Sequence, residues 1–346
     1  MYRFFLYFLF KLLLLNAFGK GKIIQHIISD NAEVSVYIPA GYDTMHTYPT
    51  IYFNDGETIF TPGYGWMLNN KLDELIDEKI IEPVIIVAID SKSNRLSWYN
   101  PYDDDWIKQN WGSYTPQAKE YTWLISEIII PFIEKKYSVK KQASARAIIG
   151  YSLGGLHATW AGLTHASVFG FSAALSPSYW VADNAILNDI NTRQHGSRFW
   201  FDLGTAEWQY YMPVYKKLQQ TGYKAGSDCF YYEAKDAGHN ANYWIQRIHY
   251  PLIAFAGINK DLSPKKMEVE FECIPSLSVA GKVYRRLNAV ITLENGIKYS
   301  LSNTASYTLL EGDIKLHDDG TIIAGTKAQT EVEVKYGSLK KEFLSS

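Results

Sequence analysis

Cysteine is scarce in this chain. Only Cys229 and Cys273 occur among its 346 residues, and they lie well apart. A disulfide framework needs more cysteines, so a small disulfide-stabilised scaffold is excluded. We expect both to be free, buried thiols, although an exported protein could join them. The chain has no Cys/His cluster at metal-ligand spacing, so nothing in the sequence supports a zinc mechanism.

The chain also lacks an excess of charge of either sign. Lys and Arg number 34 and Asp and Glu 36, which leaves a formal net charge of -2, and the pI is about 6.5. The basic residues are dispersed and form no stripe. This pattern disfavours a nucleic-acid partner.

Long hydrophobic runs are missing beyond the N-terminus. There, Arg3 precedes an apolar stretch at residues 4–15 that Lys11 interrupts, and small residues follow up to Gly19. A membrane span needs about 20 apolar residues, so we interpret residues 1–19 as a signal peptide rather than an uncleaved anchor. We therefore expect a bacterial protein that is periplasmic or secreted, with no membrane span after removal of the leader.

Aromatic residues, by contrast, are plentiful. They make up 15% of the chain, with 10 Trp and 26 Tyr. Most of these rings are expected to fill the core. The remainder suits a wet cleft that binds sugars or aromatic acyl groups.

The order of expected elements indicates an α/β fold. Two alternating segments around Asp30-Asn31 predict an antiparallel hairpin. Apolar, β-branched runs then alternate with segments of helical period, which is typical of a mostly parallel sheet with helices on both faces. This order is that of an α/β-hydrolase. We expect strands at residues 22–29, 33–39, 50–53, 84–89, 146–149, 170–175, 198–203 and 229–233, and helices at 67–78, 121–137 and 213–221.

The composition changes near residues 263–266. Beyond them helical periodicity is weak, and short alternating runs are separated by turn signals such as Asn295-Gly296 and Asp319-Gly320. Strands at this spacing predict a small all-β sandwich. We therefore expect a hydrolase domain at residues 20–263 and a β-sandwich domain at 264–346. The segment 312–336 resembles a bacterial immunoglobulin-like module.

A strained serine turn is the clearest chemical motif. Residues 150–155 read Gly-Tyr-Ser-Leu-Gly-Gly, between an apolar strand-like run and a helix-compatible stretch. This is the G-x-S-x-G nucleophile elbow, in which glycines leave room where the chain folds back and the serine hydroxyl is exposed. Ser152 is therefore the candidate nucleophile, and the backbone N–H of Leu153 is a candidate oxyanion donor.

A serine nucleophile needs a base and an acid that follow it in this fold's order. His239, in a loop after the last expected strand of the hydrolase sheet, is the candidate base, and His249 is the alternative. Glu207, just past the end of the strand at residues 198–203, is the candidate acid. The two remaining alternatives for the acid are Asp202 and Asp236.

A second oxyanion donor should come from the loop after an early central strand. Residues 54–57 read Asn-Asp-Gly-Glu and supply such a loop. Gly56 permits a close approach of the backbone, and the backbone N–H of Glu57 is our candidate. The competing interpretation is a plain turn built on Asp55-Gly56.

Taken together, these motifs resemble a family of α/β-hydrolases that includes feruloyl and acetylxylan esterases, enterochelin-type siderophore esterases and the esterase D type. The resemblance covers roughly residues 30–260. It implies an α/β-hydrolase fold, carboxylic ester substrates, and a Ser-His-acid mechanism without a cofactor. The chain has Glu207 where many members carry Asp. The residues on which this family resemblance rests are Asn54-Asp55-Gly56, Arg95, the run 128–134 with Tyr137, the elbow, Leu175-Ser176-Pro177-Ser178, Gly204-Thr205-Ala206-Glu207 and Gly238-His239.

In related esterases the region from Arg95 to Tyr121 approaches the nucleophile. Its aromatic rings, with others near residues 179–208, are expected to line an acyl or sugar pocket. Our substrate-binding candidates are Arg95, Trp98, Trp180 and Trp208.

The leading hypothesis is a secreted serine esterase with a Ser-His-Glu triad that acts on acyl or feruloyl esters of carbohydrate. Alternatives are a siderophore esterase, an acyltransferase, and an inactive hydrolase fold that binds carbohydrate. The oligomeric state and the role of the β domain stay open.

Overall fold

The computed structural model describes residues 19–30, 32–63, 66–193, 196–207, 212–274, 284–323 and 330–345. The expected signal peptide therefore lies outside the described residues except for Gly19, and Trp208 lies outside them as well. No helix within the described part of the chain is long and apolar enough to cross a bilayer.

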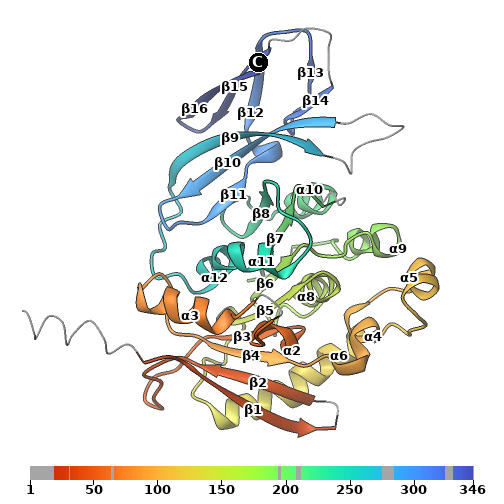
Figure 1. Cartoon of the computed structure of the whole chain (residues 1–346), viewed down its shortest axis with the longest axis vertical. Coiled ribbons are helices and arrows are strands. Elements are labelled where there is room, and N and C mark those ends of the chain that lie inside the picture. The colour runs from red at the N-terminus through yellow and green to blue at the C-terminus, as the bar shows by residue number, and fades with distance from the viewer. Residues whose placement is uncertain are drawn as a thin grey trace, which may run out of the picture.

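One eight-stranded sheet forms the first and larger part of the molecule (Figure 1). Its order is β1-β2-β4-β3-β5-β6-β7-β8. The hairpin β1-β2 is antiparallel, as expected, and β2 is antiparallel to β4, whereas all later pairs are parallel. This is the α/β-hydrolase arrangement that the sequence predicts. The strands are β1 (Lys22–Ser29), β2 (Ala32–Ile38), β3 (Thr50–Phe53), β4 (Ile85–Ile89), β5 (Arg146–Tyr151), β6 (Phe171–Leu175), β7 (Arg198–Gly204) and β8 (Cys229–Ala234).

Helices cover both faces of this sheet. The expected helix at 121–137 is a continuous run of α6, η2 and α7, in which η2 is a π-helix. Pro131, at the start of α7, lacks the N–H that a regular α-helix would use, and the wider π turn precedes it. The helices are α2 (Gly56–Ile59), α3 (Leu68–Asp77), α4 (Arg95–Tyr99), α5 (Asp105–Asn110), α6 (Ala118–Trp123), η2 (Leu124–Ile129), α7 (Ile130–Lys136), α8 (Leu153–Thr164), α9 (Val181–Asn184), α10 (Met212–Gln220), α11 (Ala241–Arg247) and α12 (His249–Ala256); short 3-10 turns are η1 (Lys92–Asn94), η3 (Ala143–Ala145) and η4 (Ala185–Asn188).

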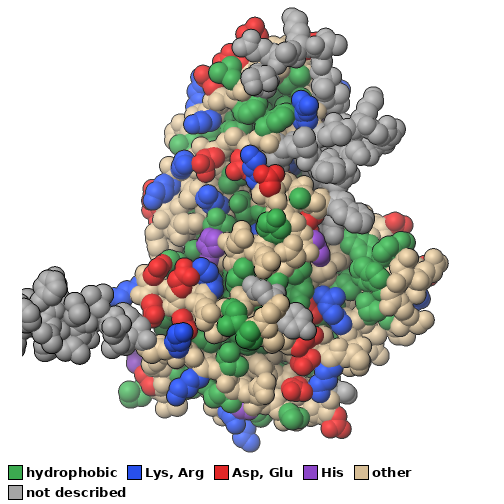
Figure 2. Space-filling model, in the orientation of Figure 1, with side chains coloured by type: hydrophobic (Ala, Val, Ile, Leu, Met, Phe, Trp, Pro, Cys, Tyr) green, Lys and Arg blue, Asp and Glu red, His purple; other side chains and the backbone are tan. Residues whose placement is uncertain are grey.

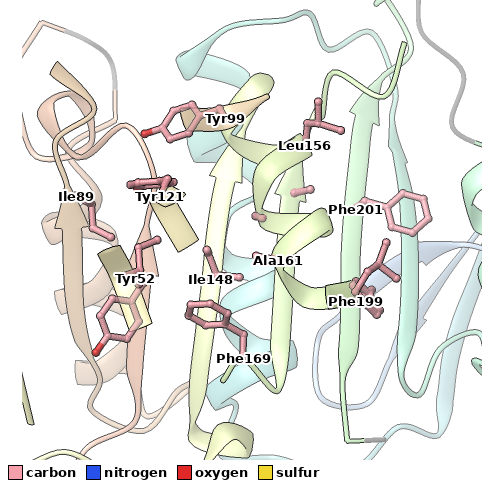
Figure 3. Packing of buried hydrophobic residues seen from close by; sticks show 14 of the residues in the cluster. Tyr52, Ile89, Tyr99, Tyr121, Ile148, Leu156, Ala161, Phe169, Phe199 and Phe201 are labelled. Atoms are coloured by element: carbon pink, nitrogen blue, oxygen red, sulfur yellow. The ribbon is translucent and has the colours of Figure 1, made fainter. Parts of the chain in front are cut away.

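The central strands are apolar on both faces because helices bury both of them. Every residue of β3, β4 and β6 is buried. Figure 3 shows Ile148 and Phe199 of the sheet beside Leu156 and Ala161 of α8. Gly162 lets α8 approach β6 closely, since a Cβ there would lie 2.6 Å from Cβ of Ser172. The elbow helix is thus held tightly against the sheet that carries the serine.

A separate, all-antiparallel β region follows and lies against the β8 edge, at the end opposite to β1 (Figure 1). It contains a five-stranded and a three-stranded sheet, as a β-sandwich requires. The immunoglobulin-like identity of this region stays a prediction. The strands are β9 (Pro264–Ile274), β10 (Tyr284–Leu293), β11 (Lys298–Ser300), β12 (Ser306–Glu311), β13 (Lys315–Leu316), β14 (Thr321–Ile323), β15 (Thr330–Tyr336) and β16 (Leu339–Ser345), with the 3-10 turn η6 (Ser302–Thr304).

The two regions meet across a buried boundary. The rings of Phe230 and Tyr299 pack edge to face, with centroids 5.8 Å apart. The amide of Glu233 donates to Oγ of Ser300 at 3.0 Å, and the Glu233 carboxylate pairs with the fully buried Arg286. Polar groups of β8 and of the strands that cover it therefore meet at this buried boundary.

Cys229 is a free, buried thiol at the start of β8, as expected, and burial raises its pKa well above the ordinary value. The side chain of Cys273 lies outside the described residues.

Candidate active site

Ser152 lies at the sharp turn between β5 and α8. Its backbone has φ 54° and ψ -123°, a conformation that residues with a Cβ rarely adopt. A Cβ on Gly150 would collide with the backbone of Gly154. A Cβ on Gly154 would in turn lie 2.9 Å from Oδ2 of Asp55. Only glycine fits these two positions, for the reason that the motif predicts.

The Ser152 side chain lies at the start of a helix. Its Oγ is 3.3 Å from Oγ of Ser178, and the Ser178 amide donates to the Ser152 carbonyl at 3.0 Å. Leu153 is the first residue of α8, and the first amides of a helix have no acceptor within it. The helix N-terminus is also the positive end of its dipole. The predicted Leu153 donor therefore lies in a position suited to an oxyanion.

The loop at residues 54–57 is attached directly to the elbow. Nδ2 of Asn54 donates to the Gly154 carbonyl at 2.8 Å, and a Cβ on Gly56 would collide with the backbone of Ala88. Glu57 is the second residue of α2. Its carboxylate accepts from the amide and hydroxyl of Ser91, at 3.1 and 2.6 Å. The Glu57 side chain thus points toward the end of β4, while its amide stays in the first turn of a helix.

A buried ion pair supports this loop, and the sequence argument missed it. Asp55 is 1% exposed and has φ 57°. Its carboxylate accepts from Nε and Nη2 of Arg95 at 2.6 and 3.0 Å, and its amide donates to the Tyr99 hydroxyl at 2.7 Å. Burial raises the pKa of Asp55 to about 6, although the guanidinium opposes that rise. Arg95, which is expected to bind substrate, holds Asp55 through two of its nitrogens in this structure, and its role toward substrate stays a prediction.

Glu207 and His239 lie together at the ends of β7 and β8. Oε2 of Glu207 is 2.7 Å from Nδ1 of His239. The Glu207 residue is 3% exposed, whereas the His239 side chain is 38% exposed. A buried carboxylate that holds one nitrogen of an accessible imidazole leaves the other nitrogen free for proton transfer.

Backbone contacts hold the loop after β7 against the loop after β8. The amide of Ala206 donates to the Ala237 carbonyl at 3.1 Å, and a Cβ on Gly204 would collide with that same carbonyl. The Gly204 amide also donates to Oε1 of Glu207 at 2.7 Å. Close packing of the loops therefore fixes where the acid and the base meet.

The alternative acids have other roles in the structure. Asp202 is fully buried and accepts from Nε of Arg247 at 2.7 Å and from Nε1 of Trp200 at 3.0 Å. Burial raises its pKa. Asp236 is exposed and has φ 56°. Neither carboxylate contacts a histidine among the described residues.

Among the described residues, no hydrogen bond or ion pair joins the alternative base, His249, to a carboxylate, and Glu74 acts on it only through its charge. His249 lies at the start of α12, and its ring centroid is 3.9 Å from that of Tyr250. Burial lowers its pKa to about 4. A ring this hard to protonate is poorly suited to shuttle a proton near neutral pH.

An aromatic stack connects the base to the elbow. The edge of His239 packs on Trp244, with centroids 5.0 Å apart, and Trp244 stacks on Tyr151 at 4.5 Å. In the described structure the Ser152 hydroxyl contacts Ser178, and no hydrogen bond joins it to His239. Trp244 was not predicted, since nothing in the local sequence distinguishes it from a core residue.

The expected substrate-binding tryptophans differ in exposure. Trp98 is 7% exposed and stacks on Tyr121 at 4.8 Å, so its ring packs inside the domain and is not accessible to a ligand here. Trp180 meets Trp106 and Trp111 edge to face, with centroid distances of 5.4 and 5.7 Å. The ring of Trp98 is thus buried in this structure, and its role in substrate binding stays a prediction.

Trp106, Trp111 and Trp180 form what we call the tryptophan cluster. Trp106 is 53% and Trp111 47% exposed. Figure 2 shows hydrophobic side chains gathered where α5 and α9 lie. One member of the cluster, Trp180, is two residues from Ser178, whose hydroxyl contacts that of Ser152.

No group of three or more His, Cys, Asp or Glu that could hold a metal occurs in the ranges that the structure describes.

A family model described as "Putative esterase" matches residues 26–255. The chain belongs to this esterase family. As a family member it is a carboxylic ester hydrolase, and the match ends before the β region begins. Protein YbbA of Bacillus subtilis is 25% identical over 254 residues, which are 70% of this chain and 98% of that protein.

Solved structures share the esterase fold. The enterobactin esterase of Shigella flexneri has a TM-score of 0.55 and 20% identity, over 68% of this chain and 58% of that chain. A feruloyl esterase module from Clostridium thermocellum, complexed with sinapinate, has a TM-score of 0.54 and 22% identity, over 68% and 88% of the two chains. At these identities the likeness concerns the fold.

Proposed function

We propose that this esterase is a serine hydrolase with Ser152, His239 and Glu207 as its triad. The observation that carries the proposal is the 2.7 Å contact between Glu207 and Nδ1 of His239. This contact supports the proposal, because a triad needs a carboxylate beside the imidazole nitrogen that keeps its proton during catalysis. The proposed nucleophile lies at the strained elbow, next in sequence to Tyr151, which stacks on Trp244.

The reaction follows the acyl-enzyme route. Oγ of Ser152 attacks the ester carbonyl while its proton passes to Nε2 of His239. The amides of Leu153 and Glu57 donate to the oxyanion, a contribution typically worth about 3 kcal/mol per donor. Collapse of the intermediate expels the alcohol, which takes the proton from His239. Water then attacks the acyl-Ser152 ester with His239 again as base, and the acid and free serine are released.

For the substrate we propose acyl or feruloyl esters of carbohydrate, met outside the cytoplasm after export. The exposed rings of the tryptophan cluster support this, since indole faces bind sugars and aromatic acyl groups. A siderophore ester is the second candidate, because a structural neighbour is an enterobactin esterase. Acyl transfer to another acceptor would use the same residues.

The test is labelling and turnover by the full chain. A fluorophosphonate should label Ser152, and p-nitrophenyl acetate should be hydrolysed by the wild type but not by Ser152→Ala. Activity retained in that variant would refute the nucleophile, and an unlabelled wild type would support an inactive, carbohydrate-binding fold. Hydrolysis of feruloylated and acetylated oligosaccharides, compared with a catecholate siderophore, then separates the substrate classes.

A further inference from the structure

A buried serine lies behind the candidate acid. Ser176 directly follows β6, is fully buried, and has φ 46°, a conformation that persists in a residue with a Cβ only when its surroundings enforce it. Its Oγ lies 2.6 Å from Oε1 of Glu207, 2.9 Å from Nε1 of Trp244 and 2.6 Å from Nη2 of Arg247. Groups from the loop after β7 and from α11 therefore meet at one hydroxyl.

The direction of these hydrogen bonds follows from the chemistry of the groups. An indole N–H and a guanidinium N–H can only donate. The contacts from Trp244 and Arg247 therefore use both lone pairs of the Ser176 oxygen. The single Ser176 proton is left for Glu207, which accepts it.

The two oxygens of the Glu207 carboxylate consequently have different partners. Its Oε1 accepts from Ser176 and from the Gly204 amide, and two donors there stabilise the ionised form. An ionised Oε2 can only accept, so Nδ1 of His239 carries its proton and Nε2 presents a lone pair.

We propose that Ser176, held by Arg247, is a positioning residue that orients Glu207 and so sets the tautomer of His239. The inference rests on the triad proposed above.

The charged groups around Ser176 and Glu207 are few and mostly buried. Arg247 and Asp202 are 3% and 0% exposed on their side chains. Nη2 of Arg247 is 3.7 Å from Oε1 of Glu207. Among the described residues, the charged or titratable groups that face Glu207 are Arg247 from α11, Asp202 from β7 and His239 from the loop after β8. One cation between two carboxylates leaves net negative charge beside His239, which favours the imidazolium formed in the reaction.

The test compares Ser176→Ala with Ser172→Ala in the full chain. Ser172 is a buried serine on β6 whose hydroxyl donates to the Ala158 carbonyl at 2.5 Å, with no link to Glu207. Ser176→Ala should lower kcat about tenfold to a hundredfold with little change in KM, since it removes a hydrogen bond to a charged group. Ser172→Ala should keep the wild-type kcat.

The pH profile separates positioning from general damage. In Ser176→Ala the Glu207 carboxylate loses the hydrogen bond from the Ser176 hydroxyl. Its negative charge then acts more strongly on His239 and stabilises the protonated imidazole. The acidic limb of kcat/KM should therefore move to higher pH in Ser176→Ala and stay in place in Ser172→Ala. An unchanged limb, or a move to lower pH, would overturn the proposal. If Ser176→Ala fails to fold, Ser176→Cys fills the space with a weak hydrogen-bonding sulfur and should shift the limb in the same direction.

A second readout needs no turnover. Ring ¹⁵N shifts of histidine-labelled protein, assigned with His239→Gln, should show the Nδ1–H tautomer in the wild type and a mixture of tautomers in Ser176→Ala. A pure Nδ1–H signal in both proteins would reject the role of Ser176. A wild type with no esterase activity would count against the proposed function, while this spectrum would still decide the positioning.

Discussion

The indole of Trp244 stacks on the ring of Tyr151, with centroids 4.5 Å apart and 27° between the planes. Tyr151 directly precedes the candidate nucleophile, and Nε1 of Trp244 donates to Ser176 behind the candidate acid. One side chain of α11 thus contacts both halves of the proposed site.

We expect Trp244→Phe to lower kcat about tenfold, because the ring stack is largely retained while the N–H donor to Ser176 is lost. The matched control is Trp66→Phe, since Trp66 stacks on Trp244 at 5.8 Å and also packs on Tyr151. Steady-state kinetics on p-nitrophenyl acetate would measure both. Equal losses in the two variants would show that packing alone is responsible.

Replacing the acid by its amide should be severe. Oε1 of Glu207 accepts from Ser176 and Gly204, so the carbonyl of Glu207→Gln must stay there and its NH₂ group must face His239. Nδ1 of His239 then becomes an acceptor, and Nε2 carries the proton in the wrong tautomer. We expect kcat to fall about a thousandfold or more.

The control for this variant is Asp236→Asn, which changes an exposed carboxylate two residues from Gly238. Its kcat should stay near that of the wild type. A stronger loss in Asp236→Asn than in Glu207→Gln would identify Asp236 as the acid.

Asp55 should make the fold pH-dependent. Its pKa is raised to about 6 by burial, against the opposing Arg95, and the ordinary value is 3.8. A raised carboxyl pKa stabilises the fold below pH 3.8, and that stability is lost as the pH rises through 6.

Between pH 4 and pH 7 this loss should reach about 2 kcal/mol, at 1.36 kcal/mol per unit of pKa difference. The measurement is the free energy of unfolding in denaturant, for the wild type and for Asp55→Asn, at both pH values. The difference between the two proteins should change with pH by this amount. A difference between the two proteins that does not change with pH would contradict the assignment. The variant should also be less active, because it weakens the pair with Arg95 that supports the loop at residues 54–57.

The tryptophan cluster should matter for large substrates only. We expect Trp106→Ala and Trp111→Ala to raise KM for feruloylated oligosaccharides about tenfold, because a stacked ring is typically worth about 1 kcal/mol or more. Hydrolysis of p-nitrophenyl acetate should be unchanged. Trp123→Ala is the control, since Trp123 is 57% exposed on α6. A KM for oligosaccharide esters that stays at the wild-type value in both cluster variants would exclude the cluster from substrate binding.

Local rules explain why much of the fold was predictable. Strands of the first sheet begin and end within two residues of the expected positions, because buried parallel strands are apolar throughout and helices between them repeat every 3.6 residues. The elbow was recognisable because a Cβ at Gly150 would meet the backbone of Gly154, and a Cβ at Gly154 would meet the side chain of Asp55. Since parallel strands end at one edge of a sheet, residues after β7 and β8 could be expected to meet there.

By itself, then, the sequence determined the α/β-hydrolase order, the serine turn and the loops from which an acid and a base come. Only the tertiary structure decided what those groups touch. Arg95 and Asp55 are 40 positions apart, and Arg247 and Ser176 are 71 apart. No periodicity encodes such pairs, since they depend on how packed helices and loops are oriented. Trp98 became core and Trp106 surface for the same reason: burial is set by neighbours that are distant in sequence.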